Sequence, residues 1–130
     1  MKSQGENTSN KKGKEAEQKA LEYLIELGYE LLQTNYRFGK KEIDIIMKDG
    51  EELVFIEVKA KFNEIYGLPE LMVTPAKMKS ILIVANFYIE QCSYSGNSRF
   101  DIISMIKVNN EFELSHFKDA FWPGVMSGGF

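Results

Sequence analysis

The stretch KKEIDIIMKDGEELVFIEVKAK, Lys40–Lys61, decides the fold that this sequence predicts. It reads as two apolar strands joined by a tight turn. Each strand carries charge inside its apolar run: Asp44 lies between two isoleucines, and Glu57 and Lys59 flank Val58. Burial of an unpaired charge is costly, so these side chains in the most hydrophobic hairpin of the chain need either solvent or a partner.

The register of this hairpin determines where its charges meet. Side chains alternate faces along a strand, so Glu57 and Lys59 share one face of the second strand. The dipeptide Asp49-Gly50 is a strong signal for the turn. A two-residue loop there pairs Asp44 with Phe55 and puts Glu57 diagonal to it, whereas a four-residue loop pairs Asp44 directly with Glu57. Either even loop brings the three charges to one side of the sheet, and an odd loop or a bulge would not.

The remainder of the chain predicts helices and strands around this hairpin. Apolar residues recur at spacings of three and four ahead of Gly28, which ends the first helix. Thr74 and Pro75 are typical of the N-cap and first position of a second helix. The expected elements are a helix over 14–27, strands over 29–36, 42–48 and 53–61, a helix from 75, and strands over 99–107 and 111–117. The order α-β-β-β-α-β-β predicts an α/β fold with a mixed central sheet flanked by helices.

Length and composition predict one domain. The chain has 130 residues and is 44% apolar, enough for one packed core. We expect a disordered polar tail over 1–12, a single domain over 13–122 and a loose tail over 123–130. No apolar run approaches the ~18 residues of a membrane span, and the polar start has no signal-peptide pattern. With one cysteine, Cys92, a cytoplasmic location is expected.

The charged residues of the hairpin are the parts of a metal-dependent hydrolase. Opposed carboxylates repel, and a divalent cation such as Mg²⁺ binds such oxygens. Lys59 is placed to orient a water molecule or to stabilise charge on a phosphate. At about 100° per residue, Glu17 is the one acid of the first helix aimed at the sheet, where it either completes the metal shell or orders a water. The alternative is that all four are solvent-facing charges on half-exposed elements.

The motifs resemble those of a known family. Asp44 followed by Glu57-Val58-Lys59 is similar to the PD-(D/E)xK signature of restriction-endonuclease-like nucleases. Nearly the whole span from 13 to 121 resembles the YraN family of small bacterial proteins, which are similar in fold to archaeal Holliday-junction resolvases. The matching pieces are Gly13-x-x-x-Glu17-x-x-Ala20-x-x-x-Leu24-x-x-x-Gly28, Asn35-Tyr36-Arg37, Glu42-Ile43-Asp44-Ile45-Ile46, Val54-Phe55-Ile56-Glu57-Val58-Lys59, Lys77, Arg99-Phe100-Asp101 and Asp119-Ala120-Phe121. The chain departs from the family at Lys41, usually Gly, and Lys61, usually Arg.

The resemblance implies a restriction-endonuclease-like fold and a metal-dependent endonuclease acting on DNA, branched or single-stranded. It implies Asp44 and Glu57 as ligands of Mg²⁺ or Mn²⁺, Lys59 as the catalytic lysine, and Glu17 in the place of the first-helix acid of the resolvases. A homodimer is expected because a DNA junction has two-fold symmetry. The alternative is a nucleic-acid-binding module on the same fold without turnover. The net charge of −3 already argues against non-specific coating of nucleic acid.

Basic residues supply the expected contacts to DNA. Lys77 falls in the first turn of the second helix, and a helix N-terminus is a natural phosphate site. Arg37, Lys61 and Arg99 are the other expected substrate contacts. For each of them the alternative is an ordinary surface position, and Arg99 can instead pair with Asp101 or another acid.

Overall fold

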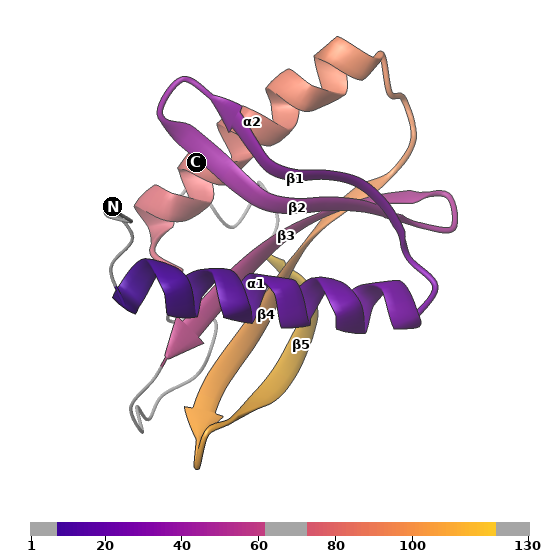
Figure 1. Cartoon of the computed structure of the whole chain (residues 1–130). Helices are drawn as coiled ribbons and strands as arrows, with labels where there is room; N and C mark the ends of the chain where they lie inside the picture. Colours follow the sequence, from indigo (N-terminus) through magenta and orange to yellow (C-terminus); the bar gives the residue numbers. More distant parts are fainter. Residues whose placement is uncertain (1–7, 62–72, 122–130) are drawn as a thin grey trace, which may run out of the picture.

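The computed structural model describes residues 8–61 and 73–121, and it forms one layer of sheet between two helices (Figure 1). The elements are α1 (Thr8–Glu26), β1 (Glu30–Phe38), β2 (Lys41–Asp49), β3 (Glu52–Lys61), α2 (Pro75–Cys92), β4 (Ser98–Val108) and β5 (Glu111–Phe121). The strands lie in the order β1-β2-β3-β4-β5. Only β3 and β4 are parallel, and α2 connects them. The expected α/β fold with its mixed sheet is confirmed.

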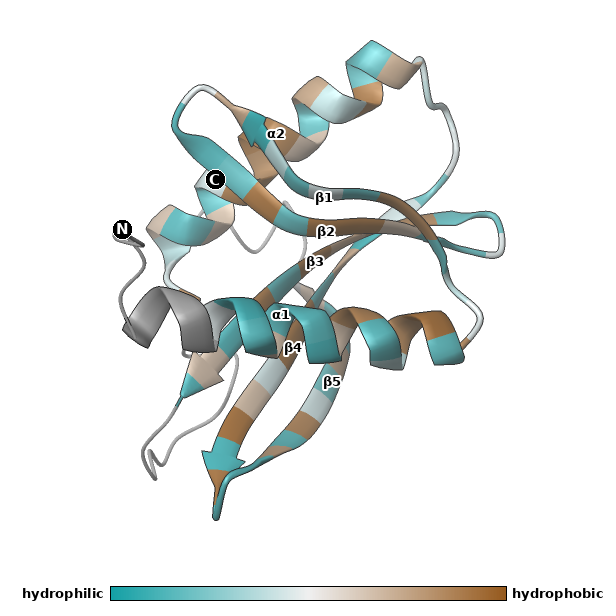
Figure 2. Ribbon diagram, in the orientation of Figure 1, coloured by the Kyte–Doolittle hydropathy of each residue, from teal (hydrophilic) through white to brown (hydrophobic). Residues whose placement is uncertain are grey.

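The two helices cover opposite faces of the sheet. In α1, Ala16, Ala20 and Leu24 are fully buried against alternate residues of β3 and β4, such as Val54 and Ile103. On the other face, the buried side of α2 packs against the intervening residues of the same strands, among them Phe55 and Phe100. The hydropathy colours agree, because the centre of the sheet, including the middle of β2, is apolar and the turn end of the β1–β2 hairpin is largely polar (Figure 2). Strand alternation therefore produces two cores, one on each face.

The first helix begins earlier than its apolar pattern predicts. We expected a helix from about residue 14, whereas α1 starts at Thr8. Residues 8–12, placed in the polar tail by composition, are therefore helical. The reason is that the apolar periodicity starts only at Ala16, so the first two turns leave no such signal. The tail expected over 123–130 lies outside the described residues. Neither helix in the described part of the chain combines the length and hydropathy needed to cross a membrane.

A buried ion network anchors the sheet at the end where β2 turns into β3. The Arg99 guanidinium donates to Asp101, Asp49 and Glu52 over 2.9–3.2 Å, and also to the Tyr29 hydroxyl at 2.8 Å. Asp101 is fully buried, and it also contacts His116 Nε2 at 2.8 Å and accepts the Asp119 N–H. The network thus ties the residue that precedes β1, the β2–β3 hairpin, β4 and β5 together.

We expect this network to make the fold sensitive to acid. Burial alone would raise the pKa of Asp101, but hydrogen bonds from His116, Arg99 and the Asp119 N–H lower it below its ordinary value of 3.8. The stabilisation by Asp101 is therefore complete above pH 3.8 and is lost as the pH falls through its lower folded-state pKa. Urea denaturation from about pH 5 to pH 2 should show this loss in the native chain. An Asp101→Asn variant with the same acid dependence would contradict the prediction.

Candidate functional site

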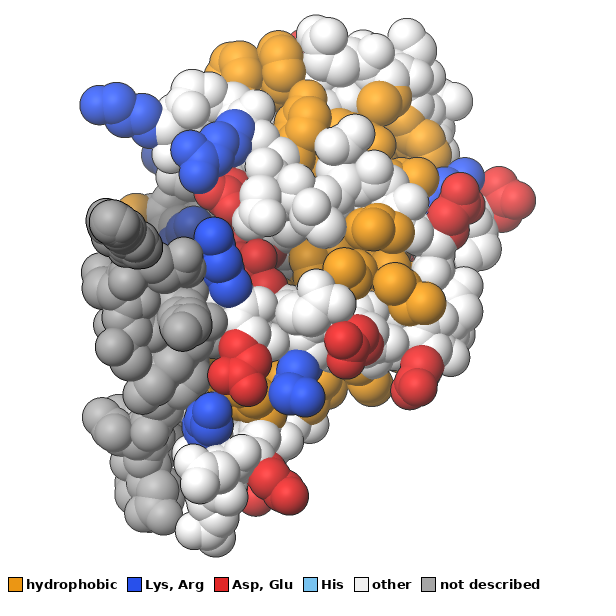
Figure 3. All heavy atoms as spheres, in the orientation of Figure 1, with side chains coloured by type: hydrophobic (Ala, Val, Ile, Leu, Met, Phe, Trp, Pro, Cys, Tyr) orange, Lys and Arg blue, Asp and Glu red, His pale blue; other side chains and the backbone are white. Residues whose placement is uncertain are grey.

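The site lies where the central hairpin opens. Pairing between β2 and β3 runs from Asp49↔Glu52 to Ile45↔Ile56. Beyond this point β2 stays paired with β1, while β3 stays paired with β4 as far as Lys61. The two strands therefore separate, and we call the opening between residues 41–44 and 57–61 the fork (Figure 1). Acidic and basic side chains gather on this side of the molecule (Figure 3).

The hairpin turn places Asp44 across from Glu57. The turn residues are Gly50 and Glu51, with Gly50 at φ 63°, one position later than the expected Asp49-Gly50 turn. Lys48 accordingly pairs with Leu53, which is the register of the longer loop considered above. Continued to the fork, this register sets Asp44 opposite Glu57. The alternation of side chains along the strands predicts Asp44, Glu57 and Lys59 on one side of the sheet. The structure brings the carboxylates of Asp44 and Glu57 together.

A backbone hydrogen bond fixes the Asp44 carboxylate inside the fork. Where the ladder has ended, the Val58 N–H no longer has a strand partner and donates to Asp44 Oδ2 at 2.8 Å. The pKa of Asp44 is raised from 3.8 to about 8, mainly by burial and further by repulsion from Glu57, while the Val58 N–H opposes the rise. The carboxylate thus lies in an environment that disfavours its negative charge.

Glu57 is more deeply buried than a half-exposed strand residue would be. Its side chain is 6% exposed, and Oε2 lies 3.6 Å from Lys77 Nζ. Its other oxygen, Oε1, is buried and has no hydrogen-bond partner among the described residues. Burial raises the pKa of Glu57, and the positive charges of Lys77 and Lys59 act against this rise. Glu57 therefore presents one oxygen near Lys77 and one that has no donor in the part of the chain that the structure describes.

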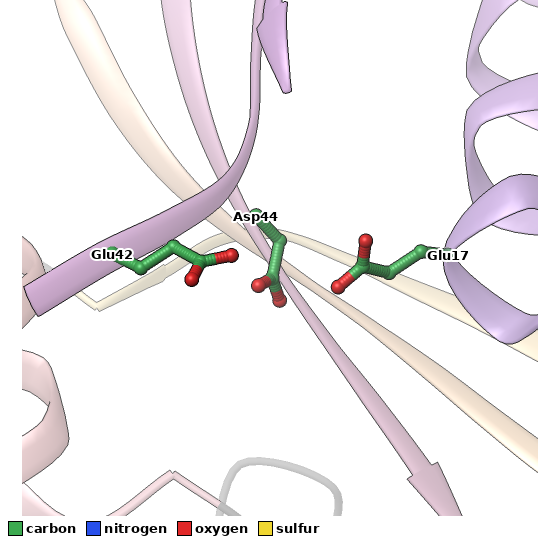
Figure 4. Close-up of side chains that lie close together, drawn as sticks. All are labelled: Glu17, Glu42 and Asp44. Atoms are coloured by element: carbon green, nitrogen blue, oxygen red, sulfur yellow. The ribbon is translucent and has the colours of Figure 1, made fainter. Parts of the chain in front are cut away.

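Glu17 reaches the fork from α1, as its helical phase predicts. Carboxylate oxygens of Glu17, Glu42 and Asp44 all lie within 4.8 Å of one another (Figure 4). Burial raises the pKa of Glu17, a hydrogen bond from Asn35 lowers it, and the charge of Glu42 raises it. We call Glu17, Glu42, Asp44 and Glu57 the acidic site. Its members come from three elements, α1, β2 and β3.

Two residues of this region were not assigned to the site by the sequence. Glu42 is not among the site residues predicted above, although its separation of two from Asp44 on one strand is a usable signal. Asn35 was assigned no role, yet its Nδ2 donates to Glu42 Oε2 at 2.6 Å and to Glu17 Oε1 at 3.3 Å. Its backbone has φ 51°, which no local pattern indicated.

The expected substrate contacts fall into two groups. Lys77 borders the acidic site through Glu57, and Arg37 is an exposed residue whose guanidinium lies 3.3 Å from Glu42. Lys61 is half-exposed at the end of β3. Arg99, in contrast, is buried in the ion network, which is the pairing with Asp101 considered as its alternative. Its side of β4 faces α1, and its donors are occupied, so we withdraw Arg99 as a substrate contact.

Comparison with known proteins identifies the family. Residues 16–105 match the model of the uncharacterised protein family UPF0102. A UPF0102 protein of Phocaeicola vulgatus is 38% identical over 116 residues, which cover 89% of this chain and 96% of that protein. A UPF0102 protein of Persephonella marina is 43% identical over 111 residues, which cover 85% of this chain and 92% of the relative. The chain therefore belongs to the UPF0102 family, which is the YraN family that its motifs resemble.

Proposed function

We propose that this chain is a divalent-cation-dependent endonuclease that hydrolyses phosphodiester bonds in DNA. The observation that carries the proposal is the acidic site itself. Carboxylates of Glu17, Glu42 and Asp44 converge where the hairpin opens, and the charge of Glu57 acts on Asp44. Glu57 also has a buried oxygen without a hydrogen-bond donor among the described residues. Carboxylates gathered in this way repel one another and lose hydration, so they need a positive partner.

The residues present fit a hard divalent cation. Mg²⁺ and Mn²⁺ prefer oxygen ligands, and carboxylates are their usual protein ligands. Asp44, Glu57 and Glu17 are the residues that would hold the ion. The chemistry that such an ion supplies is activation of a water molecule and screening of phosphate charge.

Lys59 is the residue we assign to the developing negative charge. It lies two positions after Glu57 on the same face of β3, and its charge already acts on that carboxylate. An ammonium at this position can donate to a phosphate oxygen as negative charge accumulates on it. Stabilisation of charge that develops in the transition state is usually the largest electrostatic contribution to rate. Lys77 and Arg37 flank the acidic site and are the residues proposed to bind neighbouring phosphates, with Lys61 further along β3.

Cleavage of DNA of defined structure tests the proposal. We expect cutting of branched, nicked or single-stranded DNA with Mg²⁺ or Mn²⁺ and none with a chelator. Lys59→Met should lower the rate by about 10²- to 10³-fold, the cost of removing one stabilising donor. Lys48→Met is the matched control, because Lys48 lies in the same hairpin but at the turn end. The rate should be followed as product formed under single-turnover conditions.

Two results would count against this function. If no DNA is cut with either ion, the endonuclease proposal is wrong. If the Lys59→Met protein cuts as fast as the native chain, the role assigned to Lys59 is wrong. Binding that weakens steeply with salt, without cutting, would instead identify a nucleic-acid-binding module. Sedimentation with and without branched DNA would test the proposed homodimer.

A further inference from the structure

Asn35 lies beside the acidic site on the neighbouring strand. The pairs Thr34↔Ile45 and Tyr36↔Ile43 flank it, so Asn35 is opposite Asp44 across the β1–β2 ladder. Its φ of 51° is in the left-handed region. Residues other than glycine rarely adopt this conformation, and asparagine is among those that tolerate it best. Such a conformation persists only where the surroundings enforce it. Here the departure from strand geometry coincides with the acidic site.

The Asn35 amide bridges carboxylates from two elements. One nitrogen, Nδ2, donates to Glu42 Oε2 on β2 at 2.6 Å and to Glu17 Oε1 on α1 at 3.3 Å. The other Glu42 oxygen lies 3.3 Å from the Arg37 guanidinium. A continuous chain of contacts therefore runs from Arg37 through Glu42 and Asn35 to Glu17, next to Asp44. Without the amide, repulsion among the three carboxylates would favour turning Glu17 toward solvent.

The chemical type of this bridge is informative. An amide donates hydrogen bonds to two anions without adding positive charge. A lysine or arginine at the same place would hold the acids equally well but would neutralise them and repel a cation. A neutral donor keeps the acids close together without itself neutralising their charge. If Asn35 served only the backbone turn, glycine would serve as well, since glycine adopts positive φ without strain.

We propose that Asn35 is a positioning residue that holds Glu17 and Glu42 beside Asp44 in the arrangement that binds a divalent cation. This rests on the proposed metal-dependent function. Asn35 itself does not need to touch the ion, because it acts through Glu17. Residues that orient metal ligands by hydrogen bonds typically contribute about 10- to 100-fold to metal affinity.

The test is Mn²⁺ binding to an Asn35→Gly protein, measured by calorimetry or by the resonance signal of free Mn²⁺. The substitution preserves the positive φ and removes both donated hydrogen bonds. Asn110→Gly is the matched control, because Asn110 has φ 69° in the β4–β5 turn, outside the acidic site. We expect about 10- to 100-fold weaker Mn²⁺ binding for Asn35→Gly and less than a twofold change for Asn110→Gly. The two metal-free variants should melt within a few degrees of each other.

A double substitution shows whether Asn35 acts through Glu17. If it does, Asn35→Gly added to Glu17→Gln should weaken Mn²⁺ binding no further than Glu17→Gln alone. Mn²⁺ affinity of Asn35→Gly within twofold of the native chain, or effects of the two substitutions that multiply, would overturn the inference and leave the endonuclease proposal intact. Failure of the native chain to bind Mn²⁺ at all would overturn both.

Discussion

Asp44→Asn should raise the melting temperature of the metal-free protein by several degrees while it abolishes cleavage of DNA. Asp44 is held by the Val58 N–H, and burial with repulsion from Glu57 raises its pKa to about 8. Asparagine keeps an oxygen for the Val58 N–H and removes the charge that the surroundings disfavour. Relief of such strain at a functional site commonly stabilises a protein by about 0.5–2 kcal/mol.

The same substitution should have the opposite effect when Mn²⁺ is present. A ligand that binds only the folded state stabilises it by about 2.7 kcal/mol at a concentration 100 times its dissociation constant. The native chain should gain this stabilisation and Asp44→Asn should not, so the order of the two melting temperatures inverts on addition of Mn²⁺. Thermal unfolding with and without the ion measures both effects.

Asp119→Asn is the control for the chemical change. Its side chain is exposed and lies outside the acidic site, so its melting temperature should stay close to that of the native chain in both conditions. A metal-free Asp44→Asn protein that melts below the native chain would contradict the idea that the fork stores electrostatic strain. Cleavage retained by Asp44→Asn would contradict its role in catalysis.

Asp101→Asn should be among the most destabilising single substitutions in this chain, with a loss of about 3–5 kcal/mol. Asp101 is fully buried and accepts hydrogen bonds from Arg99, His116 and the Asp119 N–H. An asparagine there presents an NH₂ group to donors and leaves part of the Arg99 charge without its partner. Removing one member of a buried ion pair costs far more than the pair contributes, because the remaining charge stays desolvated.

Urea denaturation of Asp101→Asn beside Asp119→Asn measures this loss. The two variants differ only in which aspartate becomes neutral, and the Asp119 side chain is exposed. A loss below about 1 kcal/mol for Asp101→Asn would mean that Asp49 and Glu52 already neutralise Arg99, since both also accept from its guanidinium. The same chemical change is thus expected to stabilise the metal-free protein at Asp44, to destabilise it at Asp101 and to leave its stability nearly unchanged at Asp119.

Strand periodicity predicted the core of the site. The alternation of side chains put Asp44, Glu57 and Lys59 on one side for either even loop, and helical phase aimed Glu17 at the same place. Both results depend only on the local geometry of a strand or a helix, which a short window of sequence specifies. The position of the turn was wrong by one residue, because Gly50 accommodates positive φ equally well as the first or second turn residue.

Contacts between distant segments could not be predicted from strand and helix periodicity. Arg99 was expected at the substrate but is buried, because its role depends on Asp49, Glu52 and Tyr29 meeting it from other segments of the chain. Asn35 and Glu42 join the acidic site for the same kind of reason. Their importance comes from where β1 and α1 lie relative to β2, and neither residue stands out within its own segment.

The sequence by itself determined the order of elements, the two apolar faces of the sheet, the shared side of the charged hairpin residues and the family. Each of these is encoded in periodicity or in motifs that are continuous along the chain. Only the tertiary structure decided that β2 and β3 separate beyond the Ile45↔Ile56 pair, that Asp44 accepts a hydrogen bond from the Val58 N–H there, and that Asn35 bridges two carboxylates. These features depend on pairing and packing between segments far apart in sequence. The free energies of such contacts cannot be inferred from a local sequence pattern.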